Sequence, residues 1–184
     1  MTDAEAIRRS REDAELFRPV FERHYDPIWR YLRRRLGADL ADDLASETFV
    51  LAFRARRRYE PRGESALPWL YGIAANLVAR HHRSETRRLR AYAALGALPA
   101  DELDTESLLG RLAAAERGRS LAEALAALRR ADRETLLLSA IGGLTHEQVG
   151  EALGVAAGTV AARLHRMRPA LVAAMTSTSM GALS

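Results

Sequence analysis

Three arginines in residues 144–168 have the spacing of a nucleic-acid contact surface. Arginine pairs well with phosphate and guanine because its planar guanidinium donates two parallel hydrogen bonds. In a helix these side chains lie beside an apolar stripe at positions i, i+4 and i+7. The arginines are Arg163, Arg166 and Arg168, and the stripe is Val160, Leu164 and Met167. Such a helix suits the major groove of duplex DNA; the alternative is a surface helical hairpin with solvated arginines.

The residues around these arginines predict a helix-turn-helix. Thr145 and Gln148 have the spacing of a capping box, so a first helix begins there. Gly154 tolerates the left-handed backbone with which that helix would end. Thr159 is placed to cap the second, arginine-bearing helix. We expect this second helix to end or kink near Arg168, because a proline follows and removes one hydrogen bond.

The composition is that of a soluble globular protein. The chain has 184 residues, of which 48% are hydrophobic and 28% charged, enough for one large domain or two small ones. It has no cysteine, which excludes disulfides and zinc–thiolate sites. No apolar run approaches the ~20 residues of a membrane span, and the first residues lack a signal-peptide pattern. We expect a cytoplasmic protein without membrane insertion.

Charge divides the chain into three parts. All 28 basic residues are arginine, and the net charge is +4. Residues 1–93 contain 19 arginines and 14 acidic residues, a net charge of +5. Residues 94–109 contain four acidic residues and no base, and residues 110–184 contain nine arginines and six acidic residues. Two basic segments therefore flank an acidic one, whose small residues and single proline are typical of a linker.

Apolar residues recur at helical spacing on both sides of this linker, which predicts an all-α fold. We expect two small helical domains joined by an acidic flexible linker. The predicted units are a first domain, a linker, a second domain and a disordered tail, at residues 1–93, 94–110, 111–175 and 176–184.

The first domain should begin with polar, frayed residues 1–15. A helical pattern then runs from Phe17 to Leu36, and Gly37 is placed to end it. Pro27 predicts a kink or break near Asp26. The apolar residues of this pattern are Phe17, Val20, Phe21, Ile28, Trp29, Leu32 and Leu36.

An acidic cluster follows in the next predicted helix, residues 38–58. Asp43 and Glu47 are four residues apart, and like charges at that spacing cost a helix a few tenths of a kcal/mol. Two interpretations are open. Asp42 and Asp43 could complement the positive end of the helix dipole, or the cluster could meet a basic partner.

Residues 54–90 carry the densest positive charge, ten arginines against three glutamates. Tyr59, Trp69 and Tyr71 lie among them, and a basic groove with aromatic platforms is typical of single-stranded nucleic-acid binding. Each aromatic could equally be a core residue. His81 and His82 point in different directions on a helix, so they supply too few ligands for a metal site. We expect no metal, no cofactor and no catalytic residues.

Three segments, in this order, resemble the group IV (extracytoplasmic-function, ECF) sigma factors of the sigma-70 family. They are ADDLASETFVLAF, RGESALPWLYGIAANLVARHHR and LTHEQVGEALGVAAGTVAARLHRMR. The resemblance covers nearly the whole chain. It implies a promoter-specificity subunit of bacterial RNA polymerase, with sigma region 2 before the linker and sigma region 4 after it.

The resemblance assigns a role to each segment. The first implies binding to the clamp of the largest core-polymerase subunit, through Asp42, Asp43, Glu47, Thr48 and Phe49. The second implies recognition of the minus-ten box and capture of an unstacked base. Its matching residues are Arg62, Ser65, Ala66, Leu67, Asn76, Arg80, Arg83 and Arg87.

The third segment implies recognition of the minus-thirty-five box as duplex. Its matching residues are Thr145, Thr159, Val160, Ala161, Ala162, Arg163, Arg166 and Arg168. Two departures from the family pattern stand out. The loop from Gly63 to Trp69 is one residue shorter than the commonest pattern, with Leu67 where an aromatic is frequent. Ala161 and Ala162 replace residues that are often basic and serine, although an alanine methyl can touch a thymine methyl.

The implied mechanism is binding without covalent chemistry. The partners expected from the resemblance are core RNA polymerase (clamp and flap), promoter DNA, duplex at minus thirty-five and single-stranded at minus ten, and an anti-sigma factor. The linker would thread toward the polymerase active centre. A stand-alone helix-turn-helix regulator is the alternative function; it would bind duplex without polymerase and would not need the basic density of residues 54–90.

Overall fold

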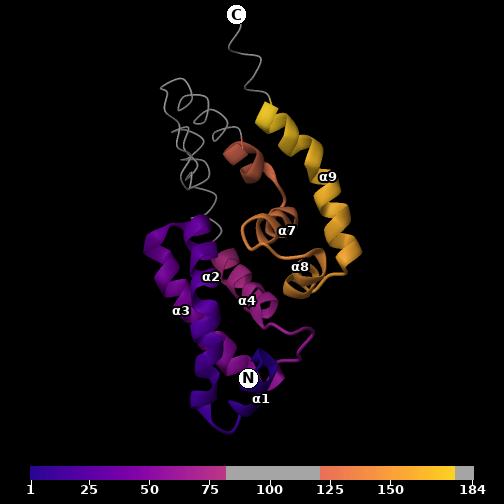
Figure 1. Cartoon of the computed structure of the whole chain (residues 1–184). Coiled ribbons are helices and arrows are strands. Elements are labelled where there is room, and N and C mark those ends of the chain that lie inside the picture. Colours follow the sequence, from indigo (N-terminus) through magenta and orange to yellow (C-terminus); the bar gives the residue numbers. More distant parts are fainter. Residues whose placement is uncertain (82–120, 177–184) are drawn as a thin grey trace, which may run out of the picture.

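The computed structural model describes residues 1–81 and 121–176. Within these ranges every regular element is helical and there is no strand. The predicted linker, residues 94–110, lies outside the described residues, as do Arg83, Arg87 and residues 177–184 of the predicted tail. Figure 1 shows α1 to α4 in one lobe and α7 to α9 in a second lobe beside it. No helix among the described residues is long and apolar enough to span a membrane.

The first lobe is built on a pair of long helices. Its elements in chain order are α1 (Asp3–Arg9), the 3-10 helix η1 (Ala14–Phe17), α2 (Arg18–Leu36), α3 (Ala38–Ala55), the 3-10 helix η2 (Arg56–Arg58) and α4 (Leu67–Arg80). Gly37 alone separates α2 from α3, at φ 94°, a backbone conformation that favours glycine. The prediction that Gly37 ends the first long helix is confirmed.

One expectation about the first lobe is wrong, and of the kink or break expected near Asp26 the break is absent. Residues 1–15 are not frayed as a whole, because α1 buries Ala6 and Ile7 and is capped by Thr2, whose hydroxyl accepts the Glu5 N–H. Nor does α2 break near Asp26. Pro27 sits inside the helix, which continues because the next turns bury a continuous apolar face, and the loss of one hydrogen bond costs less than exposing that face.

The second lobe contains the helix-turn-helix. After a helical stretch at residues 121–127 come α7 (Arg130–Ala140), α8 (His146–Leu153) and α9 (Ala157–Thr176). The predicted capping box is present: the Gln148 N–H donates to the Thr145 hydroxyl at 3.3 Å, and the Thr145 N–H donates to the Gln148 side chain at 2.9 Å. Gly154 ends α8 in the left-handed conformation, at φ 66°, as predicted.

The start of α9 differs from the prediction, and of the two outcomes expected near Arg168, an end or a kink, the end is absent. The helix begins at Ala157, so Thr159 lies inside its first turn and is not the cap. The turn is shorter than expected because the Val155 N–H donates back to the Gly150 carbonyl at 2.9 Å and closes the corner early. The helix also does not end at Arg168 but continues through Pro169, in an exposed turn, to Thr176.

The two lobes share one hydrophobic core. Helix α4 lies against α8, and both supply residues to a single cluster that includes Leu70, Leu138, Leu144 and Val149. The helices touch closely at Gly72: a Cβ there would lie 2.6 Å from the carbonyl oxygen of Ala152. A glycine is therefore required for this crossing.

A buried ion pair crosses the same boundary. The Arg35 guanidinium, on α2, donates to both carboxylate oxygens of Glu134, on α7, at 2.5 and 2.8 Å. Both side chains are buried. Tyr31, also on α2, donates its hydroxyl to Glu134 Oε2 at 3.4 Å. Removing either partner would leave a desolvated charge, so the pair holds the lobes in one register.

Candidate nucleic-acid interface

The outer face of α9 presents its polar side chains to solvent. Thr159, Ala162, Arg166 and Arg168 are exposed, whereas Val160 is fully buried and cannot touch DNA. Ala161 is half-buried. Figure 1 shows α9 on the far side of the second lobe from α2 and α3, so the first lobe does not cover this face. The first lobe therefore leaves this face of α9 open while the two lobes are in contact.

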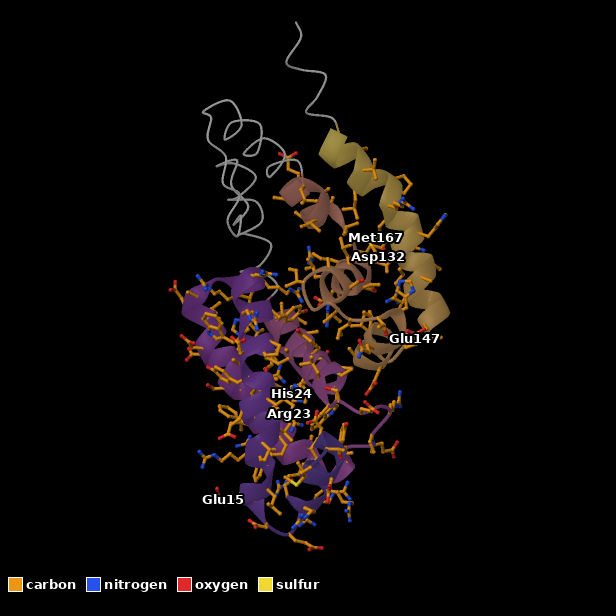
Figure 2. The ribbon with its side chains drawn as sticks, viewed as in Figure 1. Glu15, Arg23, His24, Asp132, Glu147 and Met167 are labelled. Atoms are coloured by element: carbon orange, nitrogen blue, oxygen red, sulfur yellow. The ribbon has the colours of Figure 1, made fainter. Side chains whose placement is uncertain are left out.

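Two of the predicted arginines are tied to α7. Arg163, which is half-buried, donates to the Thr135 hydroxyl at 3.2 Å. Arg166 donates to a carboxylate oxygen of Asp132 at 2.9 Å, although its own side chain is 67% exposed. Asp132 and Met167 lie at the contact between α7 and α9 (Figure 2). These bonds fix where the guanidinium groups point before any nucleic acid arrives.

The loop before α4 is exposed at its tip and buried at its end. Arg62, Gly63 and Glu64 are exposed, Ser65 is half-buried, and Ala66 is completely buried. The Leu67 N–H donates to the Ser65 hydroxyl at 3.2 Å, which tightens the turn into the helix. Leu67 is half-buried. Of the predicted minus-ten residues in this loop, only Arg62 and part of Ser65 and Leu67 are therefore open to a ligand.

Asp3 anchors the end of this loop and was missed by the sequence analysis. Its Oδ2 accepts the Ala66 N–H at 2.8 Å and lies 2.6 Å from His24 Nε2, and its Oδ1 pairs with Arg23. Burial alone would raise the pKa of Asp3, but the Ala66 N–H, His24 and Arg23 together hold that pKa below its usual value. The signal in the sequence was the capping pattern of Thr2 and an apolar residue at Ile7.

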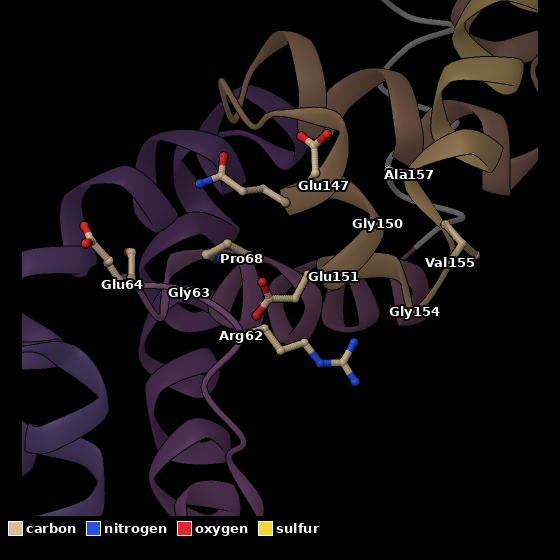
Figure 3. A pocket seen from close by; sticks show the side chains of 12 residues that line it. Arg62, Gly63, Glu64, Pro68, Glu147, Gly150, Glu151, Gly154, Val155 and Ala157 are labelled. Atoms are coloured by element: carbon tan, nitrogen blue, oxygen red, sulfur yellow. The ribbon is translucent and has the colours of Figure 1, made fainter.

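The loop tip faces α8 across a pocket of about 580 Å³. Figure 3 shows Arg62 and Glu151 on facing sides of this pocket. Burial raises the pKa of Glu151, and the nearby Arg62 opposes that rise. Helix α8 therefore forms the wall of the pocket opposite the loop.

Helix α4 carries its polar residues on the face away from the core. Asn76 and Arg80 are exposed, and Arg80 lies 3.8 Å from Glu47 of α3 in an exposed ion pair. Tyr59 and Tyr71 are buried, and the Tyr59 ring lies against Trp69 with centroids 4.6 Å apart. Tyr59 and Tyr71 are therefore core residues and not base-stacking platforms; Trp69 is half-buried.

The acidic cluster on α3 divides into exposed and buried members. Asp42, Asp43 and Glu47 are exposed, and Asp42 accepts the indole N–H of Trp29 at 2.7 Å. Thr48 is buried and its hydroxyl donates to a backbone carbonyl of the same helix, so its side chain cannot touch a partner. The exposed carboxylates form a negative surface on one face of the first lobe.

An apolar groove runs beside this acidic surface. Its floor includes Phe49, which is 5% exposed, and its rim includes Phe21 and Val50, which are 41% and 48% exposed. Large apolar side chains exposed together are typical of a protein-binding surface. Among the described residues, no group of three His, Cys, Asp or Glu side chains could hold a metal ion.

Comparison with known proteins decides the family. The family model of sigma-70 region 2 matches residues 20–88, and that of sigma-70 region 4 matches residues 118–171. RNA polymerase sigma factor CarQ of Myxococcus xanthus is 36% identical over 168 residues, covering 88% of this chain and 89% of CarQ. ECF RNA polymerase sigma factor SigL of Mycobacterium tuberculosis is 31% identical, covering 83% of this chain and 85% of SigL.

The chain belongs to the ECF group of the sigma-70 family. The predicted family is thus confirmed, and with it the function: the protein is a promoter-specificity subunit of RNA polymerase. Its first and second lobes carry the region 2 and region 4 matches respectively.

Solved structures show the same fold. CnrH, solved in complex with the cytosolic domain of CnrY, matches with a TM-score of 0.65 at 21% identity, covering 95% of this chain and 97% of CnrH. The sigma factor RpoE of Bartonella quintana, solved with the anti-sigma factor NepR, matches with a TM-score of 0.59 at 20% identity, covering 88% and 98%. The predicted all-α, two-part sigma architecture is confirmed.

Proposed function

We propose that this sigma factor reads its promoter with two separate surfaces. The outer face of α9 would bind the minus-thirty-five box as duplex, and the loop of residues 62–67 with the exposed side of α4 would hold the opened minus-ten box. The observation that carries the proposal is that basic and polar side chains on each surface are solvent-exposed within the matching sigma region; they are Arg166 and Arg168 on α9, and Arg62, Asn76 and Arg80 on the loop and α4. The chain would act in the cytoplasm by binding alone.

The minus-thirty-five contact rests on a few side chains of α9. Arg166 and Arg168 can pair with phosphates or guanine edges, and Thr159 can donate to a phosphate. Ala162 brings a methyl group to the same face, which favours contact with a thymine methyl. Arg163 and Val160 support the helix from behind.

The minus-ten contact would stabilise DNA that is already open. Arg62 and Arg80 lie on the exposed loop and helix and can follow a single-stranded backbone, while Ser65 and Asn76 can bond to base edges. Arg83 and Arg87 continue the same basic run in the sequence. Because these groups would bind unpaired bases better than duplex, binding shifts the promoter toward the melted state.

Core polymerase would bind the first lobe at its acidic surface and neighbouring groove. Asp42, Asp43 and Glu47 supply charge for a basic partner, and the apolar rim of Phe21 and Val50 supplies buried area. Thr48 and Phe49 would act by shaping α3. We also propose that an anti-sigma factor competes for these surfaces, since CnrH and RpoE are both solved with protein partners.

The lobes would have to separate on a promoter. The two boxes lie about 25 base pairs apart, roughly 85 Å at 3.4 Å per base pair. Lobes that share a core cannot reach both boxes. Residues 82–120, at up to about 3.3 Å each, can span that distance when the lobes part.

Run-off transcription tests the proposal. Genomic fragments are transcribed by sigma-free core polymerase with and without the protein, and the RNA 5′ ends are mapped. We expect new starts that share two upstream boxes. Tight footprinting by the protein alone, with no new starts, would instead support a stand-alone helix-turn-helix regulator.

A further inference from the structure

The N-terminal helix reaches the loop that we assign to the minus-ten box. Asp3, the first residue of α1, is 2% exposed, and its carboxylate touches two other segments of the first lobe. One is α2, through Arg23 and His24, which are both labelled in Figure 2. The other is the last residue of the loop, Ala66. Residues distant in the sequence thus meet at one buried acid.

The bond to Ala66 acts as a helix cap supplied by another helix. Ala66 is the N-cap residue of α4, and an alanine side chain cannot accept a hydrogen bond from the helix N-terminus. Asp3 Oδ2 accepts the Ala66 N–H at 2.8 Å and brings a negative charge to the positive end of the α4 dipole. Ala66 is fully buried. Loss of the Asp3 oxygen would therefore leave its N–H buried without an acceptor, which costs free energy of folding.

The same N-terminal segment holds the start of the loop. Arg11, just after α1, donates to the Tyr59 carbonyl at 3.4 Å, and the Ser10 carbonyl accepts from Arg56 at 3.1 Å. Residues 60–65 therefore span between two attachments to residues 3–11. The tip, with its exposed Arg62, is free between fixed ends.

We propose that Asp3 is a positioning residue for minus-ten recognition: by holding the Ala66 N–H against α2, it sets the geometry in which the loop meets an unpaired base. This inference rests on the proposed function of the loop. Discrimination between bases requires polar groups held in place before binding. A loop released at Ala66 would still bind single-stranded DNA by charge but would accept several bases.

Asp3→Asn is the central variant. The amide can keep its oxygen for Ala66 and His24 only by turning its NH₂ group toward Arg23, so the bond to Ala66 loses its charge and the network loses one acceptor. Asp3→Glu keeps the charge for Arg23 and His24 and displaces the oxygens, which provides a second variant if Asp3→Asn does not fold. Thr2→Ala is the matched control, since it removes the α1 cap and leaves the carboxylate in place.

The measurement uses holoenzyme assembled from core polymerase and each full-length variant. Promoters carry every base at each minus-ten position above a constant minus-thirty-five box, and initiation rates are compared on duplex templates and on templates with the minus-ten box already opened by mismatches. Assembly with core polymerase and thermal unfolding are measured for the same proteins.

We expect both Asp3 variants to lower the preference for the best base about tenfold on either template, as loss of a charge-assisted hydrogen bond would. Thr2→Ala should keep the preference even where its melting temperature falls. Unchanged preference in the Asp3 variants, or an equal loss in Thr2→Ala, would overturn the inference. If the wild-type protein itself shows no base preference at this box, the proposed function of the loop is what fails.

Discussion

At the scale of single residues, the structure separates exposed side chains on the proposed DNA-binding face of α9 from side chains that pack or bond behind that face. Arg168 is exposed on α9, whereas Arg163 and Arg166 also bond to α7. The sequence predicted all three as contact residues because periodicity shows the face of a helix but not its bonding partners. It likewise placed Val160 and Thr48 among contact residues, although both are buried, since family position alone does not distinguish contact from support.

Replacing Arg166 by alanine should weaken promoter binding by holoenzyme and reduce its salt dependence. One lost phosphate contact lowers the magnitude of the slope of log affinity against log salt by about 1. The pair with Asp132 is largely exposed on the arginine side, so the loss of folding stability should stay within about 1 kcal/mol. Arg129→Ala, which removes an exposed arginine outside α9, is the control; an equal effect there would assign the change to net charge.

Tyr59 should tolerate loss of its hydroxyl. The Tyr59 Oη is buried without a hydrogen-bond partner among the described residues, and burial raises its pKa to about 12. Tyr59→Phe should therefore unfold in urea with unchanged or slightly higher stability, whereas Tyr59→Ala should cost about 3–5 kcal/mol.

The same tyrosine predicts an alkaline limit. The folded pKa of Tyr59 lies above the unfolded value near 10. The protonated hydroxyl therefore contributes fully to the free energy of unfolding below pH 10, and this contribution is lost as pH rises toward 12. Unfolding measured across this range should show a smaller loss for Tyr59→Phe than for the wild type.

At the scale of elements, local chemistry in the sequence was enough to place many boundaries. The capping box of Thr145 and the glycines at 37 and 154 end or begin helices as predicted, because each acts within a few residues. Thr159 was wrongly taken as a cap because the corner is closed by a bond from Val155 to Gly150. The docking of α1 was missed because the Thr2 cap and Ile7 indicate only that a helix forms there, whereas its packing depends on tertiary contacts.

Gly150 should be the least replaceable glycine of the helix-turn-helix. A Cβ there would lie 2.6 Å from the Val155 carbonyl, so Gly150→Ala must shift the corner and should cost about 1–3 kcal/mol. Gly158→Ala is the matched control, because nothing lies within 4 Å of its Cβ and alanine favours the helix by up to about 1 kcal/mol. Urea unfolding of the two variants should move in opposite directions; a stabilised Gly150→Ala would contradict the close approach.

At the scale of the whole molecule, two sigma regions form one body. The sequence correctly divided the chain into two helical parts, but their contact could not be predicted, since Gly72, Arg35 and Glu134 carry no local signal of the surfaces they join. The contacts of these residues form only in the folded protein, where α4 crosses α8 and α2 meets α7.

Gly72→Leu should separate the lobes. Its side chain would collide with the Ala152 carbonyl, and no flexible neighbour can move aside. We expect a larger radius of gyration by small-angle scattering and a urea transition that splits in two. Gly63→Leu, at an exposed position with nothing within 4 Å of a Cβ, controls for the added side chain. An unchanged radius for Gly72→Leu would show that this crossing does not hold the lobes together.

The buried pair of Arg35 and Glu134 would also bear on how strongly the holoenzyme holds a promoter. If both boxes are reached only when the lobes part, the apparent affinity for the promoter falls by the fraction of molecules that are open. Every tenfold gain in closure would then demand tenfold more holoenzyme for the same promoter occupancy. Two side chains far from the proposed DNA contacts would therefore help to set how often a promoter of this sigma factor is used.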